Sequence, residues 1–306
     1  MGVRCEACVN LPSANVLIQV AIVGLLTGGV YALMAGGLSL IFGVLRVINI
    51  AHGAFLVFGA YLAYWLFRLY GLDPILSILI TIPLFFLVGA VVQRTMLSRV
   101  RSEPGLFVLV TFALAITLEG IMGALWQSTG RSVRTAYTGE VIKLAVLDFN
   151  LRLPVVRIVG FGAAIAVLGF FHTLLLRSNL GRAIRATIQN STAAQLVGVN
   201  VSRVQAVAFG LGLAAVAAGG SIFSLIWTFN AASHEEWISK MLSVIVLGGM
   251  GSLPGAFIAA LIMGVVESVA AVTMTTYLSP IVFYLVLFLV LIFRPQGLMG
   301  TRIREG

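Results

Sequence analysis

Two carboxylates, Glu119 and Glu267, interrupt long apolar stretches of the sequence. If these stretches cross a bilayer, an acid at its centre costs about 2.5–3.5 kcal/mol on insertion scales, so each should face protein or water rather than lipid. Such an acid can line or gate a transport pathway, or it can be protonated and bond a neighbouring helix. Both interpretations stay open. No lysine or arginine is expected at mid-span to pair with either acid.

Two further sets of polar or glycine residues follow apolar runs that are short or interrupted. The first set is Asn49, His52 and Gly53, and the second is Gly248, Gly249 and Gly251. Unwound backbone at membrane depth survives only against protein or water, so a matched pair of interruptions predicts a transport pathway or gate. The alternative is that the glycines only allow helices to cross closely.

The residues that could bind a metal do not form a recognisable site. Cys5 and Cys8 have the C-x-x-C spacing, but zinc needs four ligands and no second pair lies nearby. His234, Glu235 and Glu236 are adjacent, yet without further ligands they are expected to form a solvated outer loop. The sequence therefore predicts no metal and no bound cofactor.

The sequence also contains no motif for nucleotide binding or for catalysis. A P-loop needs G-x-x-x-x-G-K-[ST], and the two lysines, Lys143 and Lys240, lie in other contexts. No His-Glu-x-x-His motif or Ser/His/Asp set is present either. The chain is predicted not to be an enzyme, and any ATP-driven action must depend on a partner.

The elements that position these residues must lie in a membrane. Hydrophobic residues make up 60% of the 306 positions, charged residues only 9%, and the mean hydropathy is +1.10. An average soluble chain is about 25% charged. The net charge of +9 is scattered over short loops, which is typical of topology signals rather than of nucleic-acid binding.

The sequence predicts an all-α, polytopic bundle that forms a single domain over residues 1–306, with eight to ten crossings. A span needs about 20 apolar residues. Eight firm spans are Val16–Met34, Ala51–Phe67, Pro74–Val92, Leu106–Trp126, Pro154–Leu176, Ala206–Trp227, Pro254–Val272 and Pro280–Phe293. Two short, broken segments are Gly36–Ile48 and Ile238–Met250. On this topology both run in the same direction, which suggests an internal duplication.

Basic residues set the predicted orientation, because cytoplasmic loops carry the excess of lysine and arginine. Ten crossings with the amino terminus inside place twelve basic residues in the cytoplasm and seven, including Lys240, outside. Residues 127–153 then form a periplasmic loop, and residues 177–205 form a cytoplasmic one.

The cytoplasmic loop begins with a basic helical face. Arg182, Arg185 and Gln189 have the i, i+3, i+7 spacing that puts them on one side of a helix. A loop that only supplies positive charge to the cytoplasmic side would explain the arginines as well.

A second, very short helix is predicted directly after this face. Thr192 and Gln195 have the spacing of a capping box, so the helix is expected to start at Thr192, carry Ala193 and Ala194, and end at Gly198. A helix of under two turns is not stable alone in water. It needs a partner surface, which makes Arg182, Arg185 and this helix candidates for contact with an ATPase.

This stretch resembles the EAA loop of ABC importer permeases, the coupling helix that docks on the ATPase. Thr192 replaces the usual Glu, and the Ile-x-Leu-Pro ending is missing. Nearly the whole chain is similar to the LivH/LivM-type branched-chain amino-acid permeases, and the Asn49–Gly53 run favours the LivH-like member. The matching runs are Gly28–Leu33, Leu45–Gly53, Gly59–Tyr61, Gly181–Ala186, Ala194–Arg203, Leu247–Ala256 and Arg294–Gly300.

The resemblance implies a multi-pass protein of the bacterial inner membrane that forms a pathway with a second, LivM-like permease. Two cytoplasmic P-loop ATPases and a periplasmic binding protein complete the implied complex. Branched-chain or other hydrophobic amino acids are the expected substrates, and urea, amides or aromatic carboxylates stay open.

A rival class is a secondary transporter or channel driven by an ion gradient. Glu119 and Glu267 favour it. The expected lack of mid-span acids with basic partners and the docking-type loop speak against it.

Overall fold

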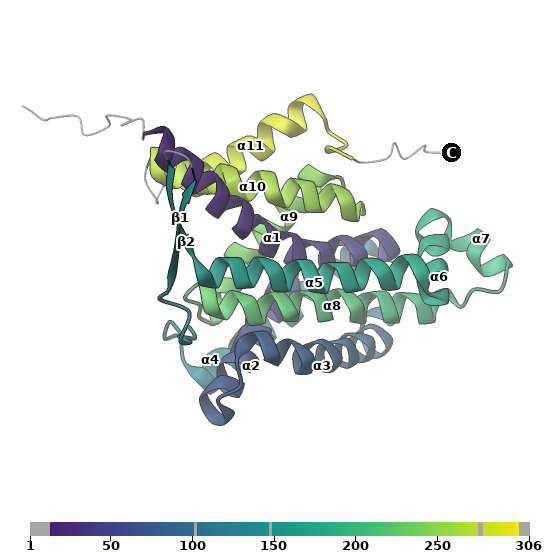
Figure 1. Cartoon of the computed structure of the whole chain (residues 1–306). Coiled ribbons are helices and arrows are strands. Elements are labelled where there is room, and N and C mark those ends of the chain that lie inside the picture. Colours follow the sequence, from purple (N-terminus) through teal and green to yellow (C-terminus); the bar gives the residue numbers. More distant parts are fainter. Residues whose placement is uncertain (1–12, 101–102, 147–148, 275–277, 300–306) are drawn as a thin grey trace, which may run out of the picture.

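The computed structural model describes residues 13–100, 103–146, 149–274 and 278–299. Within these ranges the chain is almost entirely helical (Figure 1). The helices are α1 (Ala14–Leu45), α2 (His52–Tyr70), α3 (Pro74–Thr95), α4 (Pro104–Trp126), α5 (Val155–Arg177), α6 (Asn179–Gln189), α7 (Ser191–Leu196), α8 (Val201–Ile226), α9 (His234–Gly248), α10 (Leu253–Thr273) and α11 (Ser279–Phe293). The strands β1 (Val141–Val146) and β2 (Phe149–Pro154) pair antiparallel.

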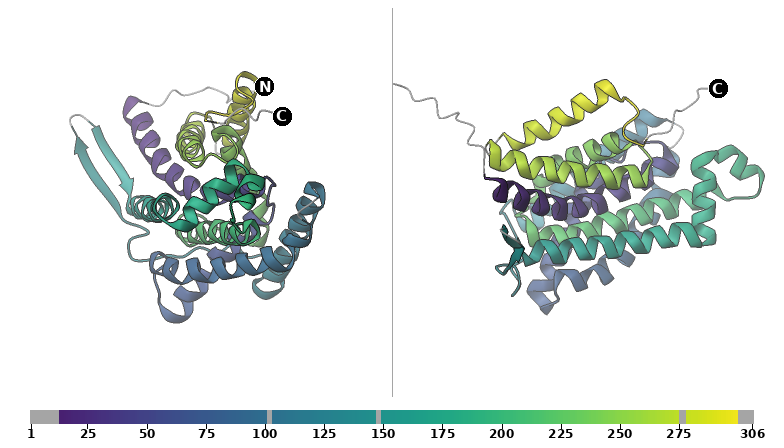
Figure 2. Two further views of the ribbon diagram at one scale, coloured as in Figure 1. Left: turned by 90° about the vertical axis from the view of Figure 1, so that its right-hand side faces the viewer. Right: turned by 45° about the horizontal axis from the view of Figure 1, so that its top comes forward.

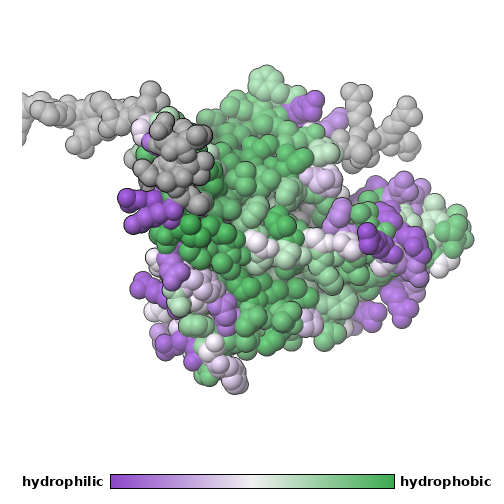
Figure 3. Space-filling view, viewed as in Figure 1, coloured by the Kyte–Doolittle hydropathy of each residue, from purple (hydrophilic) through white to green (hydrophobic). Residues whose placement is uncertain are grey.

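Seven helices, α1 to α5, α8 and α10, are long and apolar enough to cross a membrane, and α11 is a shorter apolar helix. Hydrophobic residues form a belt around the bundle, and hydrophilic residues gather at its two ends (Figure 3). The predicted all-α, multi-pass bundle is confirmed, although the described residues contain seven such helices where eight to ten crossings were predicted.

Helix α8 is the centre of the bundle. Its Ala- and Gly-rich stretch Ala214–Gly220 lets α1, α2 and α3 approach closely, and 94% of its most apolar stretch is buried. Only 22% of the most apolar stretch of α4 is buried. Helix α4 therefore lies at the edge of the bundle, and this chain covers little of its surface.

The expected break at Gly36–Ile48 is wrong, because α1 is one continuous helix from Ala14 to Leu45. A Cβ at Gly37 would lie 2.4 Å from the carbonyl oxygen of Gly212 on α8, so this glycine permits a close helix crossing. Helix α1 ends only at Arg46, which adopts a left-handed conformation with φ 55°.

Helix α1 crosses once where two crossings were predicted, and this reverses the predicted orientation of the amino-terminal side. The start of α1 lies at the hairpin end of the bundle, and its last turn reaches α6, where Arg46 donates to the carbonyl of Ile188 (Figure 1). The start of α1 and residues 177–205 are therefore at opposite ends, not on the same side as expected. Cys5 and Cys8 lie outside the described residues.

The hairpin gives structure to the loop at residues 127–153. It projects sideways past the bundle at the level where α5 begins (Figure 2). Its base is tied down by Tyr137, whose hydroxyl donates to the Asp73 carboxylate at 2.8 Å. Burial and this hydrogen bond raise the pKa of Tyr137 to about 12, so the bond persists at any physiological pH.

Candidate translocation site and coupling loop

The basic face predicted at Arg182 and Arg185 lies on α6, beyond the end of α5. Ser178 separates the two helices and accepts a hydrogen bond from the Gly181 N–H as the N-cap of α6. The Arg185 guanidinium donates back to the carbonyl of Leu175 in the last turn of α5. Arg182 donates to Asn179 within α6. Arg185 therefore holds the α5–α6 corner in one shape, and Arg182 braces the first turn of α6.

The short helix is α7, and its start differs from the predicted one. Asn190 is the N-cap, with its Oδ1 accepting from Ala193 N–H at 3.0 Å, so the expected capping box of Thr192 with Gln195 is wrong. Asn190 precedes the helix by one residue and reaches N3, which satisfies the same free N–H groups. The predicted end is confirmed, since Gly198 has φ 88°.

The side chains of α7 divide clearly into a buried and an exposed set. Ala194 is buried, whereas Leu196 and the following Val197 are 85% and 80% exposed. This helix extends past the other helices at its end of the bundle (Figure 1). Two adjacent aliphatic side chains at a protruding tip are suited to contact another protein surface.

The first interruption, Asn49 to Gly53, enters the interior of the bundle. His52 begins α2, and its Nε2 lies 3.2 Å from the carbonyl of Met34, which is eleven residues, or about 16 Å, before the end of α1. Residues 46–51 therefore fold back between the helices, where the Ile50 N–H donates to Thr111 at 3.3 Å. Asn49 and His52 are fully buried.

The second interruption lies at the start of α9 and not at its glycine-rich end. After α8, residues 227–233 return into the bundle, and α9 begins at His234 beside Gly53 of α2. His234 is buried, and its Nε2 lies 3.8 Å from the Glu119 carboxylate. The expectation that His234 belongs to a solvated loop is wrong, although Glu235 and Glu236 are exposed.

The amino-terminal ends of α2 and α9 thus meet inside the bundle, next to Glu119. Helix amino termini carry partial positive charge and free N–H groups. Among the described residues, the Asn49 amide and the Nδ1 atoms of His52 and His234 have no hydrogen-bond partner. Buried polar groups of this kind cost free energy unless they are paired. The arrangement is a polar junction that can bind polar groups or rearrange.

Gly53 makes this junction possible, which gives a direct test. A Cβ at this position would lie 2.5 Å from the carbonyl oxygen of His234 and 2.9 Å from the Ile238 Cβ. We expect Gly53→Val to push α2 and α9 apart and to cost about 1–3 kcal/mol. Thermal unfolding of the purified protein in detergent measures this cost. The matched control is Gly162→Val on α5, where a Cβ would meet nothing within 4 Å. An unchanged unfolding midpoint would contradict the close contact.

Glu267 lies in a separate network, and it has the basic partner that the sequence did not predict. Lys240 on α9 donates to Glu267 at 2.9 Å and to Glu236 at 2.8 Å, and the Tyr31 hydroxyl donates to Glu267 at 2.7 Å. Lys240 is buried, so its assignment to the outer loops is wrong. The segment after Trp227 folds inward, which carries this lysine to membrane depth.

Gly248, Gly249 and Gly251 lie away from both networks. They form the turn between α9 and α10 at the end of the bundle that carries α6, where Gly249 has φ 100° and Gly251 has φ 84°. Backbone N–H groups of Leu298 and Met299 donate to this turn. Residues 36–45 of α1 and residues 238–248 of α9 both run toward this end of the bundle, which is the common direction that the sequence predicted.

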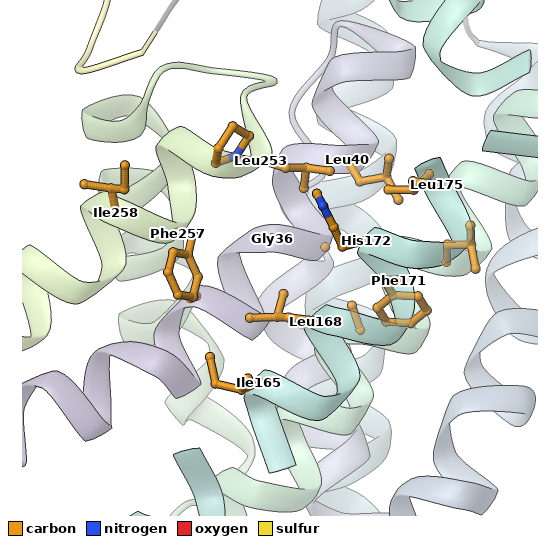
Figure 4. A pocket seen from close by; sticks show the side chains of 16 residues that line it. Gly36, Leu40, Ile165, Leu168, Phe171, His172, Leu175, Leu253, Phe257 and Ile258 are labelled. Carbon is orange, nitrogen blue, oxygen red and sulfur yellow. The ribbon is translucent and has the colours of Figure 1, made fainter. Parts of the chain in front are cut away.

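A groove of about 610 Å³ lies elsewhere, between α5 and α10 with α1 as its floor. Its lining is aliphatic and aromatic, including Leu168, Phe257 and Gly36, and His172 is its one imidazole (Figure 4). It contains none of the predicted pathway residues.

Comparisons with known proteins agree over most of the chain. The family model described as "Branched-chain amino acid transport system / permease component" matches residues 20–293. The LivH permease of a high-affinity branched-chain amino acid transport system from Salmonella typhimurium is 29% identical over 296 residues, covering 90% of this chain and 93% of that protein.

Two further relatives have the same kind of description. The BraD permease of Pseudomonas aeruginosa is 26% identical over 303 residues, covering 95% of this chain and 98% of that protein. The LivM permease of Salmonella typhimurium is 24% identical over 290 residues, covering 88% and 68%. No solved structure matches. With its apolar helical bundle, the chain is therefore a multi-pass membrane protein that belongs to the permease components of branched-chain amino acid transport systems, as a LivH-type member.

Proposed function

We propose that this chain is one of two permease subunits of an ATP-driven importer for branched-chain or other hydrophobic amino acids. It forms the pathway with a second, LivM-like permease in the bacterial inner membrane. Two cytoplasmic P-loop ATPases supply the energy, and a periplasmic binding protein delivers the substrate at the hairpin end.

The observation that carries this proposal is the form of α6 and α7. A six-residue helix outside the membrane is not stable by itself. Here it is capped at both ends, held by the α5–α6 corner, and it presents Leu196 and Val197 to solvent. Such a rigid apolar tip suits the groove of a soluble ATPase, which puts the α7 end in the cytoplasm.

For the pathway, the proposal assigns the polar junction of Asn49, His52 and Gly53 with Glu119. A junction of two helix ends can separate and re-form without breaking a continuous helix. The glycine turn at Gly248–Gly251 is a hinge at the cytoplasmic end on this proposal. Glu267 stabilises α9 through Lys240.

The carboxylates also bear on the substrate class. Glu119 and Glu236 have side chains that are 31% and 60% exposed, so a pathway beside them is negatively charged. Like charges repel across a contact, which disfavours aromatic carboxylates and favours substrates that carry an ammonium group. Amino acids fit this better than urea or simple amides do.

Reconstitution tests the assignment. The complete complex, with candidate partners taken from neighbouring reading frames, is placed in liposomes with ATP at the ATPase side and loaded binding protein at the other. We expect ATP-dependent leucine uptake, and none when a non-hydrolysable analogue replaces ATP. Uptake that persists with the analogue would contradict the proposal.

One observation favours the rival, a transporter driven by an ion gradient. The buried Lys240 pairs with Glu267 and with the more exposed Glu236, and acid–base groups at membrane depth are typical of ion-coupled carriers. The test is the purified chain alone in liposomes under a proton or sodium gradient. Gradient-driven amino-acid uptake without ATPases would establish the rival and exclude the importer.

A further inference from the structure

The face of the bundle formed by α4 and the first turn of α9 carries charge at membrane depth. Glu119 is fifteen residues, or about 22 Å, past the start of α4, and His234 is about 21 Å before the end of α9. Both positions fall within a hydrocarbon core about 30 Å thick. Glu119, Glu235 and Glu236 nevertheless have exposed or partly exposed side chains.

Lipid is therefore excluded as the neighbour of this face. Exposed carboxylates at this depth must face protein or water. Lys240 pairs with Glu236 and Glu267, and Arg157 also acts on Glu267. Among the described residues, Glu119 and Glu235 have no lysine or arginine within salt-bridge distance, which leaves the face with a surplus of acid. The buried His234 imidazole is directed at Glu119 from within the bundle, and its Nδ1 has no partner among the described residues.

The outward side of α4 combines exposed large residues, including Phe112 and Ile121, with one stripe of small residues. Ala113, Thr117, Gly120 and Ala124 are exposed and recur at intervals of four, three and four residues, which is one stripe of the helix. A Cβ at Gly120 would meet nothing within 4 Å. Stripes of small residues are typical of contacts between membrane helices.

Helix α3 provides an internal comparison for a lipid-facing surface. Its exposed residues are large and aliphatic, including Leu79, Leu87 and Val91, and its helix has no exposed carboxylate. It also packs against α8 along its length, whereas α4 has sparse contacts with this chain, chiefly with α2 and residues 231–233. Helix α4 also exposes large residues such as Ile116 and Leu125, so the small-residue stripe and the partly exposed Glu119 are what distinguish it from α3.

We propose that the α4–α9 face, defined by Ala113, Thr117, Gly120 and Ala124 with Glu119, Glu235 and Glu236, packs against the second permease. This rests on the proposed function, because it requires a second permease. The partner's helix lies on the α4 stripe, and the carboxylates border the space between the two subunits.

The occupant is a different permease and not a second copy. Two copies related by symmetry would bring their acidic clusters together, and like charges across an interface cost several kcal/mol. A LivM-like chain can supply basic or neutral residues at the same position. The groove beside α5 offers no such argument, since nothing charged selects what covers it.

Photo-crosslinking tests the proposal. Benzoylphenylalanine replaces Thr117 or Ala124 on α4, with Leu79 and Leu87 on α3 as matched exposed controls and Ala166 on α5 as the competing face. The variants are co-expressed with the LivM-like permease, irradiated in membranes and analysed by mass spectrometry. We expect a product joined to the second permease from Thr117 and Ala124, and only background from the other three positions.

Three crosslinking results would overturn the proposal. They are a product from Ala166 or from α3 at equal yield, a product made of two copies of this chain, and no product from α4 while the second permease co-purifies. In each case ATP-dependent uptake by the complex would leave the proposed function standing. Failure of both co-purification and uptake would instead reject the proposed function itself.

A substitution gives the second readout. Thr117→Leu with Gly120→Leu fills the stripe at positions with open space, so the bundle should fold as before. We expect about tenfold less co-purified second permease, which corresponds to about 1.4 kcal/mol. The control is Leu79→Phe on α3, and equal co-purification of both variants would contradict the contact.

Discussion

Replacing both Leu196 and Val197 with aspartate is expected to abolish ATP-driven uptake while leaving the membrane protein folded. The two side chains are 85% and 80% exposed, so their loss removes nothing from the bundle. Burying a carboxylate where a partner expects an aliphatic side chain costs about 2 kcal/mol or more, which weakens docking more than tenfold. The measurement is stimulation of the ATPases by loaded binding protein in the reconstituted complex.

The matched control keeps the tip apolar: Leu196→Met with Val197→Ile should retain most of the stimulation. Ala194 and Gly198, which the sequence singled out, are less informative positions. Ala194 is buried and Gly198 has a positive φ, so large charged residues there would unfold α7 itself. Normal uptake by the double aspartate variant would remove the docking role of α7.

Replacing Lys240 with methionine is expected to produce a large loss of stability. Among the described residues, Glu267 would then keep one side-chain hydrogen bond, from the Tyr31 hydroxyl, and the electrostatic effect of Arg157, with its side chain 19% exposed. Removing one partner of a buried ion pair costs about 3–5 kcal/mol, because the remaining charge is uncompensated. Thermal unfolding in detergent, together with the amount of protein inserted in membranes, measures this.

A double variant separates the charge from the packing. Lys240→Met with Glu267→Gln removes both charges at similar volume, so much of the stability should return. Lys143→Met on the exposed hairpin serves as the control for losing a lysine. If Lys240→Met alone unfolds at the normal temperature, the pair is not a structural element and its place in the network must be revised.

The positions of the membrane-spanning helices were predictable, because a long apolar run is visible in the sequence itself. Each of the eight firm spans corresponds to a helix, with ends displaced by at most five residues, except that α1 continues eleven residues past the predicted end at Met34. Residues 36–48 could not be assigned in this way, because a glycine that breaks a helix and one that packs against a neighbour look the same in sequence. Only the position of Gly212 on α8 shows that Gly37 is of the second kind.

The sequence predicted which acidic residues lie inside the bundle, but it did not predict the residues that contact them. Glu119 and Glu267 are where the apolar runs put them, but Lys240 and His234 come to them through a segment that folds back into the bundle. Hydropathy places such a segment outside, since its Asn230, Glu235 and Glu236 are polar. The β-branched residues Val141, Ile142 and Val146 favour a strand, and the sequence prediction did not include one there.

The corner between α5 and α6 has a mechanical consequence. The hydrogen bond from Arg185 to the Leu175 carbonyl and the N-cap at Ser178 fix the angle between the two helices. A push on α7 therefore cannot be absorbed by bending there, and it has to travel as a tilt of the whole of α5 against its neighbours. A displacement of α7 would therefore move the other end of α5 sideways, at the hairpin. That end is about 35 Å away, because α5 has 23 residues.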